Sequence, residues 1–126
     1  TGLEESYTGM NRGIRKQSTE EEIYPVLELT GNSPMVASEK IIKINDKLII
    51  FGCDSEQCDI ILAHESVSVQ HACLTWQDSG AVRISDLGSE SGTWVNYAPV
   101  SGAGTILNDG DLVQIGKFSF RYRIGM

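Results

Sequence analysis

The chain has 126 residues, of which 40% are hydrophobic and 21% charged, and this predicts one globular domain with a single core. Seventeen acidic residues against ten basic ones give a net charge of −7, which argues against a nucleic-acid partner because DNA binding requires a basic surface. No stretch reaches the roughly 18 consecutive apolar residues of a membrane span, so we expect no membrane contact from this fragment.

Residues 1–22 contain three glycines and a switch from basic residues to three consecutive glutamates, with little apolar periodicity. This composition predicts a flexible N-terminal tail, followed by one domain over residues 23–126. Within the tail, Ser18 and Thr19 lie between basic and acidic residues and are candidate phosphosites.

From residue 23 onward the pattern indicates short strands. Apolar and polar residues alternate over 71–77, 82–85 and 118–124, as in half-buried strands, and the continuous apolar run 48–51 predicts a fully buried one. Turn signals such as Asn108-Asp109-Gly110-Asp111 separate these segments. No helical period of ten or more residues is evident, so we expect an all-β sandwich or barrel.

The three cysteines, Cys53, Cys58 and Cys73, form an odd set without Cys-x-x-Cys spacing. This favours free thiols and an intracellular location, in the nucleus or cytoplasm. Combined with His64 and His71, the cysteines match no familiar zinc spacing, so we expect no metal and no cofactor.

A series of motifs follows in order along the chain. These are Gly52, Ser-Val-Gln-His at 68–71, Asp-Leu-Gly-Ser at 86–89, Ser-Gly-Thr-Trp-Val-Asn at 91–96, and Leu-Asn-Asp-Gly-Asp at 107–111. The series resembles the forkhead-associated (FHA) domain family, over roughly residues 23–124. The resemblance implies a β-sandwich of two antiparallel or mixed sheets with many short strands, which captures phosphothreonine peptides.

The resemblance also implies roles for single residues. The peptide-binding positions of the family correspond to Cys53, Ser68, Val69, Ser91, Gly92 and Thr93. The positions that support the site correspond to Gly52, His71 and Asn96, and the family histidine braces the loop that holds the phosphate-binding serine.

Three of the ligand positions depart from the family pattern. Cys53 replaces an Arg, Val69 replaces an Arg or Lys, and Ser91 replaces an Asn, whereas Ser68 is unchanged. Loss of these partners costs roughly 3–6 kcal/mol of phosphopeptide binding, at about 1.5–3 kcal/mol for each charge-assisted hydrogen bond. No Lys or Arg occurs from residue 48 to 82 to compensate.

We therefore expect a non-catalytic protein-interaction module with a degenerate phosphate pocket, which binds a protein partner independently of phosphate. Trp94 and Tyr97 are candidate apolar anchors. Two alternatives stay open. The first is recognition of phosphothreonine through Ser68 and Ser91 with a substitute cation, and the second is a regulatory domain of a larger enzyme outside this fragment. The segment 88–92 lacks the central serine of a nucleophile elbow, and we expect no enzyme.

Overall fold

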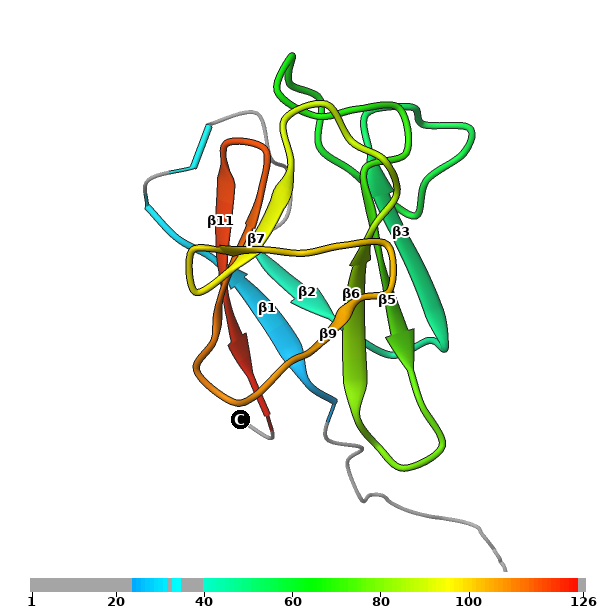
Figure 1. Cartoon of the computed structure of the whole chain (residues 1–126), viewed down its shortest axis with the longest axis vertical. Coiled ribbons are helices and arrows are strands. Elements are labelled where there is room, and N and C mark those ends of the chain that lie inside the picture. Colours follow the sequence, from blue (N-terminus) through cyan, green and yellow to red (C-terminus); the bar gives the residue numbers. More distant parts are fainter. Residues whose placement is uncertain (1–23, 32, 35–39, 125–126) are drawn as a thin grey trace, which may run out of the picture.

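The computed structural model describes residues 24–31, 33–34 and 40–124, which form a sandwich of two sheets (Figure 1). One sheet has six strands in the order β2-β1-β11-β10-β7-β8. These are β1 (Val26–Leu29), β2 (Ile41–Lys43), β7 (Thr93–Val95), β8 (Ala98–Pro99), β10 (Leu112–Ile115) and β11 (Phe118–Arg123). All of its paired strands are antiparallel.

The other sheet has five strands in the order β4-β3-β5-β6-β9. These are β3 (Leu48–Gly52), β4 (Ile60–Ile61), β5 (Ala72–Trp76), β6 (Val82–Asp86) and β9 (Thr105–Ile106). β3 and β4 pair in parallel, whereas the remaining pairs are antiparallel, so this sheet is mixed. The described residues contain no helix, and the predicted all-β sandwich is confirmed.

The core lies between the sheets and consists of alternate residues of the strands. On β11 the inward positions are Phe118, Phe120 and Tyr122, all of which are buried, and the ring of Phe120 meets that of Phe51 edge-on across the sandwich, 6.3 Å between centroids. Burial raises the pKa of Tyr122. The predicted alternation is confirmed over β5, β6 and residues 118–123 of β11, whereas Ile124, the last residue of the predicted segment, is exposed.

The prediction of a fully buried strand at 48–51 is wrong in part. Ile49 and Phe51 are buried, whereas Leu48 is 49% exposed, because successive side chains of β3 point to opposite faces of the sheet. The outward face of this sheet carries apolar residues that a sequence pattern cannot separate from the core.

The predicted tail lies outside the described residues, together with Ser18 and Thr19, so the boundary at residue 23 stays a prediction. No helix among the described residues is long and apolar enough to cross a membrane.

Candidate peptide-binding site

Three loops meet at one end of the sandwich, at the top of Figure 1. They join β3 to β4 (residues 53–59), β4 to β5 (62–71) and β6 to β7 (87–92), and we call them the apical loops. All predicted peptide-binding positions except Thr93, the first residue of β7, belong to these loops. The fold thus brings together residues that lie up to 40 positions apart in the sequence.

Gly52 allows the first two apical loops to approach closely. A Cβ atom at this position would lie 2.1 Å from the carbonyl oxygen of Val69 and 2.6 Å from the Sγ atom of Cys58, so only glycine fits. The Cys53 N–H donates to the Ser68 carbonyl at 3.0 Å. Gly52 therefore permits the close approach of the backbone that joins the first two apical loops.

His71 joins the second and third apical loops from below. It is fully buried, and its Nδ1 atom accepts a hydrogen bond from the Ser68 N–H at 3.0 Å, while Nε2 lies 2.7 Å from the Gly92 carbonyl oxygen. Because a backbone N–H can only donate and a carbonyl can only accept, the imidazole must carry its proton on Nε2. The expected bracing geometry of His71 is present.

Asp86 organises the third loop. One carboxylate oxygen accepts the N–H groups of Gly88 and Ser89 at 3.0 and 2.9 Å, and the other accepts the hydroxyls of Ser89 and Thr93 at 2.6 and 2.7 Å. Burial raises the pKa of Asp86, but hydrogen bonds from Ser89, Thr93 and the backbone outweigh it, and the net result is a lowered pKa. The Ser89 hydroxyl in turn accepts the Gly92 N–H at 2.9 Å.

Six residues thus form one connected set beneath the loops, which we call the bracing network: Ser68, His71, Asp86, Ser89, Gly92 and Thr93. Sequence reasoning assigned Gly92 and Thr93 to peptide binding. The structure places Thr93 within this network, since its side chain is buried and its hydroxyl donates to Asp86. Asp86 was recognised only as part of a motif, and its carboxylate role becomes visible from the contacts alone.

Four of the predicted peptide-binding positions, which we call the contact positions, differ in exposure and hydrogen bonding: Cys53, Ser68, Val69 and Ser91. The Ser68 hydroxyl accepts the Glu90 N–H at 3.1 Å and keeps its own proton to donate. Val69 is 50% exposed, and Ser91 is exposed. Cys53 is half-buried and packs against the core. Cys53 therefore presents less of its side chain to a ligand than its loop position suggests.

The charge around the loops is mainly negative. Asp54, Glu56, Glu65 and Glu90 all belong to the apical loops, and no Lys or Arg does. The Asp54 carboxylate accepts the Glu56 N–H at 3.0 Å, and this bond together with one from the Gln57 side chain lowers the pKa of Asp54. Asp54 thus keeps its charge to a lower pH than an ordinary aspartate does.

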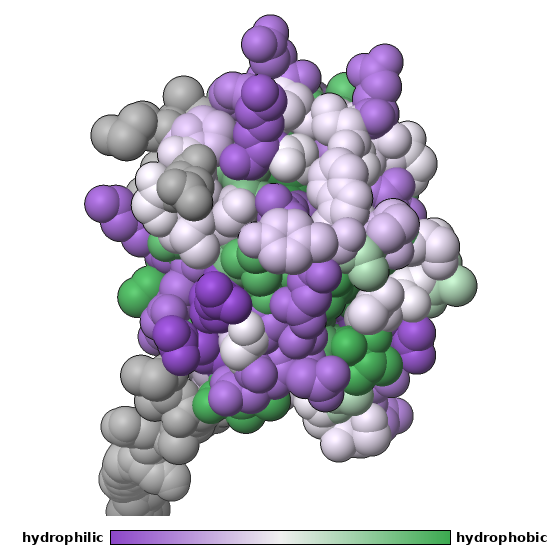
Figure 2. Space-filling model, turned by 60° about the vertical axis from the view of Figure 1, so that its left-hand side comes forward, coloured by the Kyte–Doolittle hydropathy of each residue, from purple (hydrophilic) through white to green (hydrophobic). Residues whose placement is uncertain are grey.

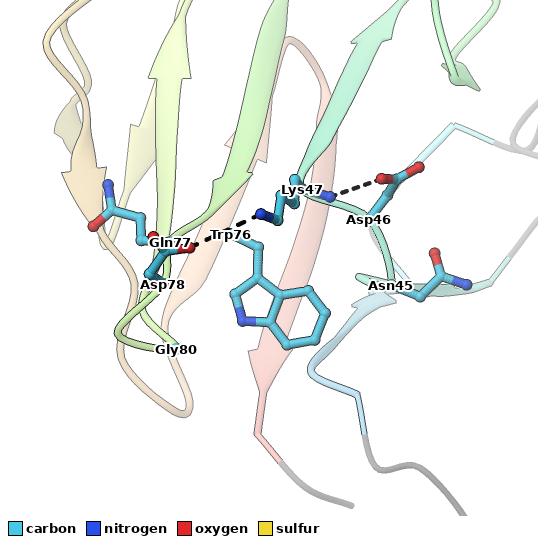
Figure 3. A pocket seen from close by; sticks show the side chains of 7 residues that line it. All are labelled: Asn45, Asp46, Lys47, Trp76, Gln77, Asp78 and Gly80. Carbon is cyan, nitrogen blue, oxygen red and sulfur yellow. Dashed lines mark hydrogen bonds and ion pairs between the residues drawn. The ribbon is translucent and has the colours of Figure 1, made fainter.

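Lys47 and Arg83, the basic residues that flank the Lys- and Arg-free segment 48–82, do not reach the loops. Lys47 precedes β3 at the opposite end of the sandwich, where Nζ lies 3.9 Å from an Asp78 carboxylate oxygen beside the Trp76 ring (Figure 3). Arg83 lies within β6 and donates to the Ala103 carbonyl at 3.3 Å.

Lys117 is a cation that sequence reasoning missed. Its N–H donates to the Ser66 hydroxyl at 3.0 Å, and this places the β10–β11 turn against the second apical loop. Ser66 lies 51 positions earlier in the sequence and no local motif links the two, so only the pairing of the strands could have revealed this contact.

Asn96 lies at the far end of β7 from the apical loops. Its amide oxygen accepts the Leu112 N–H at 2.9 Å, and its amide nitrogen donates to Asp111 at 2.9 Å. Asn96 therefore braces the β7–β8 turn and the start of β10, and its support for the loops is indirect.

The cysteines form no metal site in the part of the chain that the structure describes, where no group of three potential ligands was found. All three are free and half-buried, and the Cys58 thiol donates to the Val69 carbonyl at 3.0 Å. Burial raises the pKa of both Cys58 and Cys73, which disfavours the thiolate form.

Comparison with known proteins identifies the family to which this arrangement of loops belongs. The family model of the FHA domain matches residues 49–116, more than half of the chain and all three apical loops. The chain belongs to the FHA domain family. As such it is a protein-interaction module of the phosphopeptide-binding type, and the family resemblance read from its motifs is confirmed.

Two curated relatives are regulatory proteins by name. A protein phosphatase 1 regulatory inhibitor subunit homologue of Arabidopsis thaliana is 41% identical over 54 residues, which are 43% of this chain and 15% of that protein. An oxoglutarate dehydrogenase inhibitor of Corynebacterium diphtheriae is 44% identical over 62 residues, 49% of this chain and 41% of that protein. The chain spans less than half the length of these curated relatives.

A solved structure matches the fold over most of the FHA domain. A domain from a structural and functional study of phosphothreonine-dependent FHA domain interactions has a TM-score of 0.67 and 25% sequence identity. The alignment covers 82% of this chain and 98% of that domain. The two-sheet architecture of this chain is therefore that of an FHA domain.

Proposed function

We propose that this FHA domain is a non-catalytic interaction module whose apical loops bind a protein partner independently of phosphate. The observation that carries the proposal is the exposed apolar surface where the family carries its cation. Val69 is 50% exposed and Leu87, at the start of the third loop, is 42% exposed. Apolar side chains on binding loops favour association through burial of surface rather than through charge.

The charges of the loops support the same proposal. The backbone of Glu90 lies within hydrogen-bonding distance of the Ser68 hydroxyl, so an exposed carboxylate belongs to the loop that a phosphate would approach. A phosphate carries about −1.5 to −2 charges at neutral pH, and like charge without an intervening cation disfavours its binding. The acidic loops thus oppose the ligand that the family usually takes.

The bracing network supports retention of a binding function. Residues that fix the shape of the loops favour binding, because a preorganised surface loses less conformational entropy when a partner binds. The free thiols of Cys53, Cys58 and Cys73 are compatible with action inside the cell.

The proposal is tested by capture of partners from an extract of the source organism with the immobilised domain. The extract is divided, and one half is treated with phosphatase. We expect the same partners from both halves, and their loss when the bait carries Val69→Asp and Leu87→Asp. Exposed Ile106→Asp, on β9 of the five-stranded sheet, is the matched control. Loss of all partners after phosphatase treatment would refute phosphate independence.

Recognition of phosphothreonine is a second candidate, and the position of Lys117 favours it. The Ser68 hydroxyl has a proton to donate, Ser91 is exposed in the third loop, and Lys117 binds the second loop through its backbone. Lys117→Ala then abolishes binding of a phosphothreonine peptide, whereas the phosphate-independent proposal predicts no such binding to abolish. A peptide that includes phospho-Thr19 belongs in this test.

A regulatory role within a larger protein is compatible with either ligand. The relatives named as inhibitors are longer than the matched stretch, so further segments lie beyond that stretch in those proteins. We propose that the domain regulates an enzyme, on the same chain or on a partner, without chemistry of its own. Sequencing of the gene beyond both ends of this chain tests whether that enzyme is covalently attached.

A further inference from the structure

A groove of about 560 Å³ crosses the outer face of the six-stranded sheet, away from the core. Its floor is formed by outward residues of β10 and β11, which face each other across the ladder as Leu112 with Arg121 and Gln114 with Ser119. Figure 2 brings this side of the molecule forward and shows hydrophilic residues over much of it, with hydrophobic atoms between them. The apical binding surface proposed above does not include this groove.

Tyr97 stands at the edge of the groove in a costly backbone conformation. It occupies the two-residue turn between β7 and β8, where Val95 pairs with Ala98 and both central residues have positive φ, 50° at Asn96 and 70° at Tyr97. This is the geometry of a type I′ turn, for which Asn-Gly is the preferred pair. Positive φ is an outlier for a bulky residue and is retained where the surroundings or a function demand it.

The Tyr97 side chain buries little of its surface against the rest of the fold. It is 74% exposed, the highest value among the exposed large hydrophobic residues of the described chain. The Asn96 side chain already fixes the turn through its bonds to Leu112 and Asp111, so the tyrosine is not needed to close it. A strained backbone that holds an aromatic ring in solvent indicates a contact residue, since tyrosine is enriched among interface hot spots.

The charge of the groove is opposite to that of the whole chain. Lys117 and Arg121 line it, and neither forms an ion pair with an acidic side chain among the described residues. Arg121 donates to the Gly110 carbonyl at 2.8 Å. Across the sheet, Glu28 is Arg121's neighbour on β1, but its carboxylate pairs with Arg123 at 2.8 Å. Two cations without an ion-pair partner among the described residues thus line the groove beside an exposed ring, in a chain of net charge −7.

We propose that this groove is a second docking site, which binds an acidic segment of a protein partner. Carboxylates of the segment pair with Lys117 and Arg121, and an apolar side chain beside them packs on Tyr97. Gln114 and Ser119 supply hydrogen-bonding groups between these two contacts. The groove contains none of the predicted contact positions of the apical loops, although the Lys117 backbone meets Ser66 of the second loop. One partner can therefore engage both surfaces, or two partners can bind together.

The test uses the full 126-residue chain labelled with ¹⁵N and a pool of short synthetic peptides with randomised Glu and Leu positions. A matched pool carries Gln in place of Glu. We expect saturable chemical-shift changes at Tyr97, Lys117 and Arg121 with the acidic pool, absent with the Gln pool, and weaker as salt is raised. Absence of binding by the acidic pool, or shifts confined to the apical loops, would overturn the proposal.

Variants then separate this site from a general charge effect. Tyr97→Gly suits the turn and lowers affinity about thirtyfold, the loss typical of an aromatic hot spot. Lys117→Glu lowers affinity as well, while its backbone bond to Ser66 remains. Lys47→Glu makes the same change in net charge at the opposite end of the sandwich and leaves affinity unchanged. Equal losses with Lys47→Glu and Lys117→Glu would refute a localised site.

Val69→Asp with Leu87→Asp distinguishes this inference from the proposed function. These substitutions alter the apical loops alone, and we expect binding of the acidic pool to persist in the double variant. Loss of acidic binding in that variant, with no loss in Tyr97→Gly, would assign the peptide to the apical loops instead.

Discussion

The bracing network and the contact positions adjoin in the second and third apical loops, yet they differ in how closely they follow the pattern that the family resemblance implies. Beneath the loops, His71 hydrogen-bonds to Ser68 and Gly92. The Asp86 carboxylate accepts hydrogen bonds from Gly88, Ser89 and Thr93. Above them, Cys53, Val69 and Ser91 stand where the resemblance implies an Arg, an Arg or Lys, and an Asn. A loop can therefore keep its shape while its ligand chemistry changes, because different residues carry the two tasks.

The largest expected effect comes from restoration of the family side chains. The triple variant Cys53→Arg, Val69→Arg and Ser91→Asn should gain about 3–6 kcal/mol of binding energy for a phosphothreonine peptide, through charge-assisted hydrogen bonds from a preformed loop. Calorimetry against phosphorylated and unphosphorylated peptides measures this gain. No gain in a folded triple variant would mean that the loops have also lost the shape that the ligand requires.

Removal of the central brace should reduce stability. His71→Ala leaves a buried cavity and deprives the Ser68 N–H and the Gly92 carbonyl of their partner, and we expect a loss of about 3 kcal/mol in the free energy of unfolding. Urea denaturation measures it. The neighbouring Gln70→Ala removes one long hydrogen bond on the surface and serves as the control. Equal effects of the two changes would contradict the central role of His71.

Asp86 should make stability depend on pH in acid. Asp86→Asn leaves donors of the third loop without a carboxylate and should cost about 2 kcal/mol near neutral pH. Because the pKa of Asp86 is lower in the folded state than its ordinary value of 3.8, its contribution is present above that value and is lost as the pH falls through the folded pKa. The difference between wild type and variant should therefore shrink below pH 3.8. A difference that is constant with pH would assign the effect to packing.

The smallest effect has the opposite sign. Tyr97→Gly should raise the free energy of unfolding by about 1 kcal/mol, because glycine adopts positive φ without strain. Asn96→Gly is the contrasting variant, since it removes two side-chain hydrogen bonds and should destabilise the turn. A stability unchanged by Tyr97→Gly would show that the tyrosine is not held at a cost.

Much of the fold was predictable because it rests on local patterns. Alternation over 118–124 located β11 and its buried aromatic face, and the motif at 68–71 led to the brace at His71. The two-residue strands β4, β8 and β9 were not predictable, since a ladder of that length leaves no periodic signal.

The parts of the site that were missed depend on tertiary pairing. Lys117 meets Ser66, which lies 51 positions earlier in the sequence. Lys47 and Lys117 each directly precede a strand, and nothing in the sequence shows that they lie at opposite ends of the sandwich. The sequence also did not reveal which side chains of the site are exposed. Cys53 packs against the core, whereas Val69 in the next loop is half exposed to solvent. A motif identifies which positions form a site, but not which of them a ligand can reach.

Phosphate independence is tested most directly by calorimetry of the unmodified domain against a pool of phosphothreonine peptides and the same pool without phosphate. The phosphopeptide that contains Thr19 is included in the first pool. The replaced contact positions predict no difference in heat between the two pools. Saturable binding of the phosphorylated pool alone, removed by Ser68→Ala, would contradict the account and assign the loops to phosphothreonine.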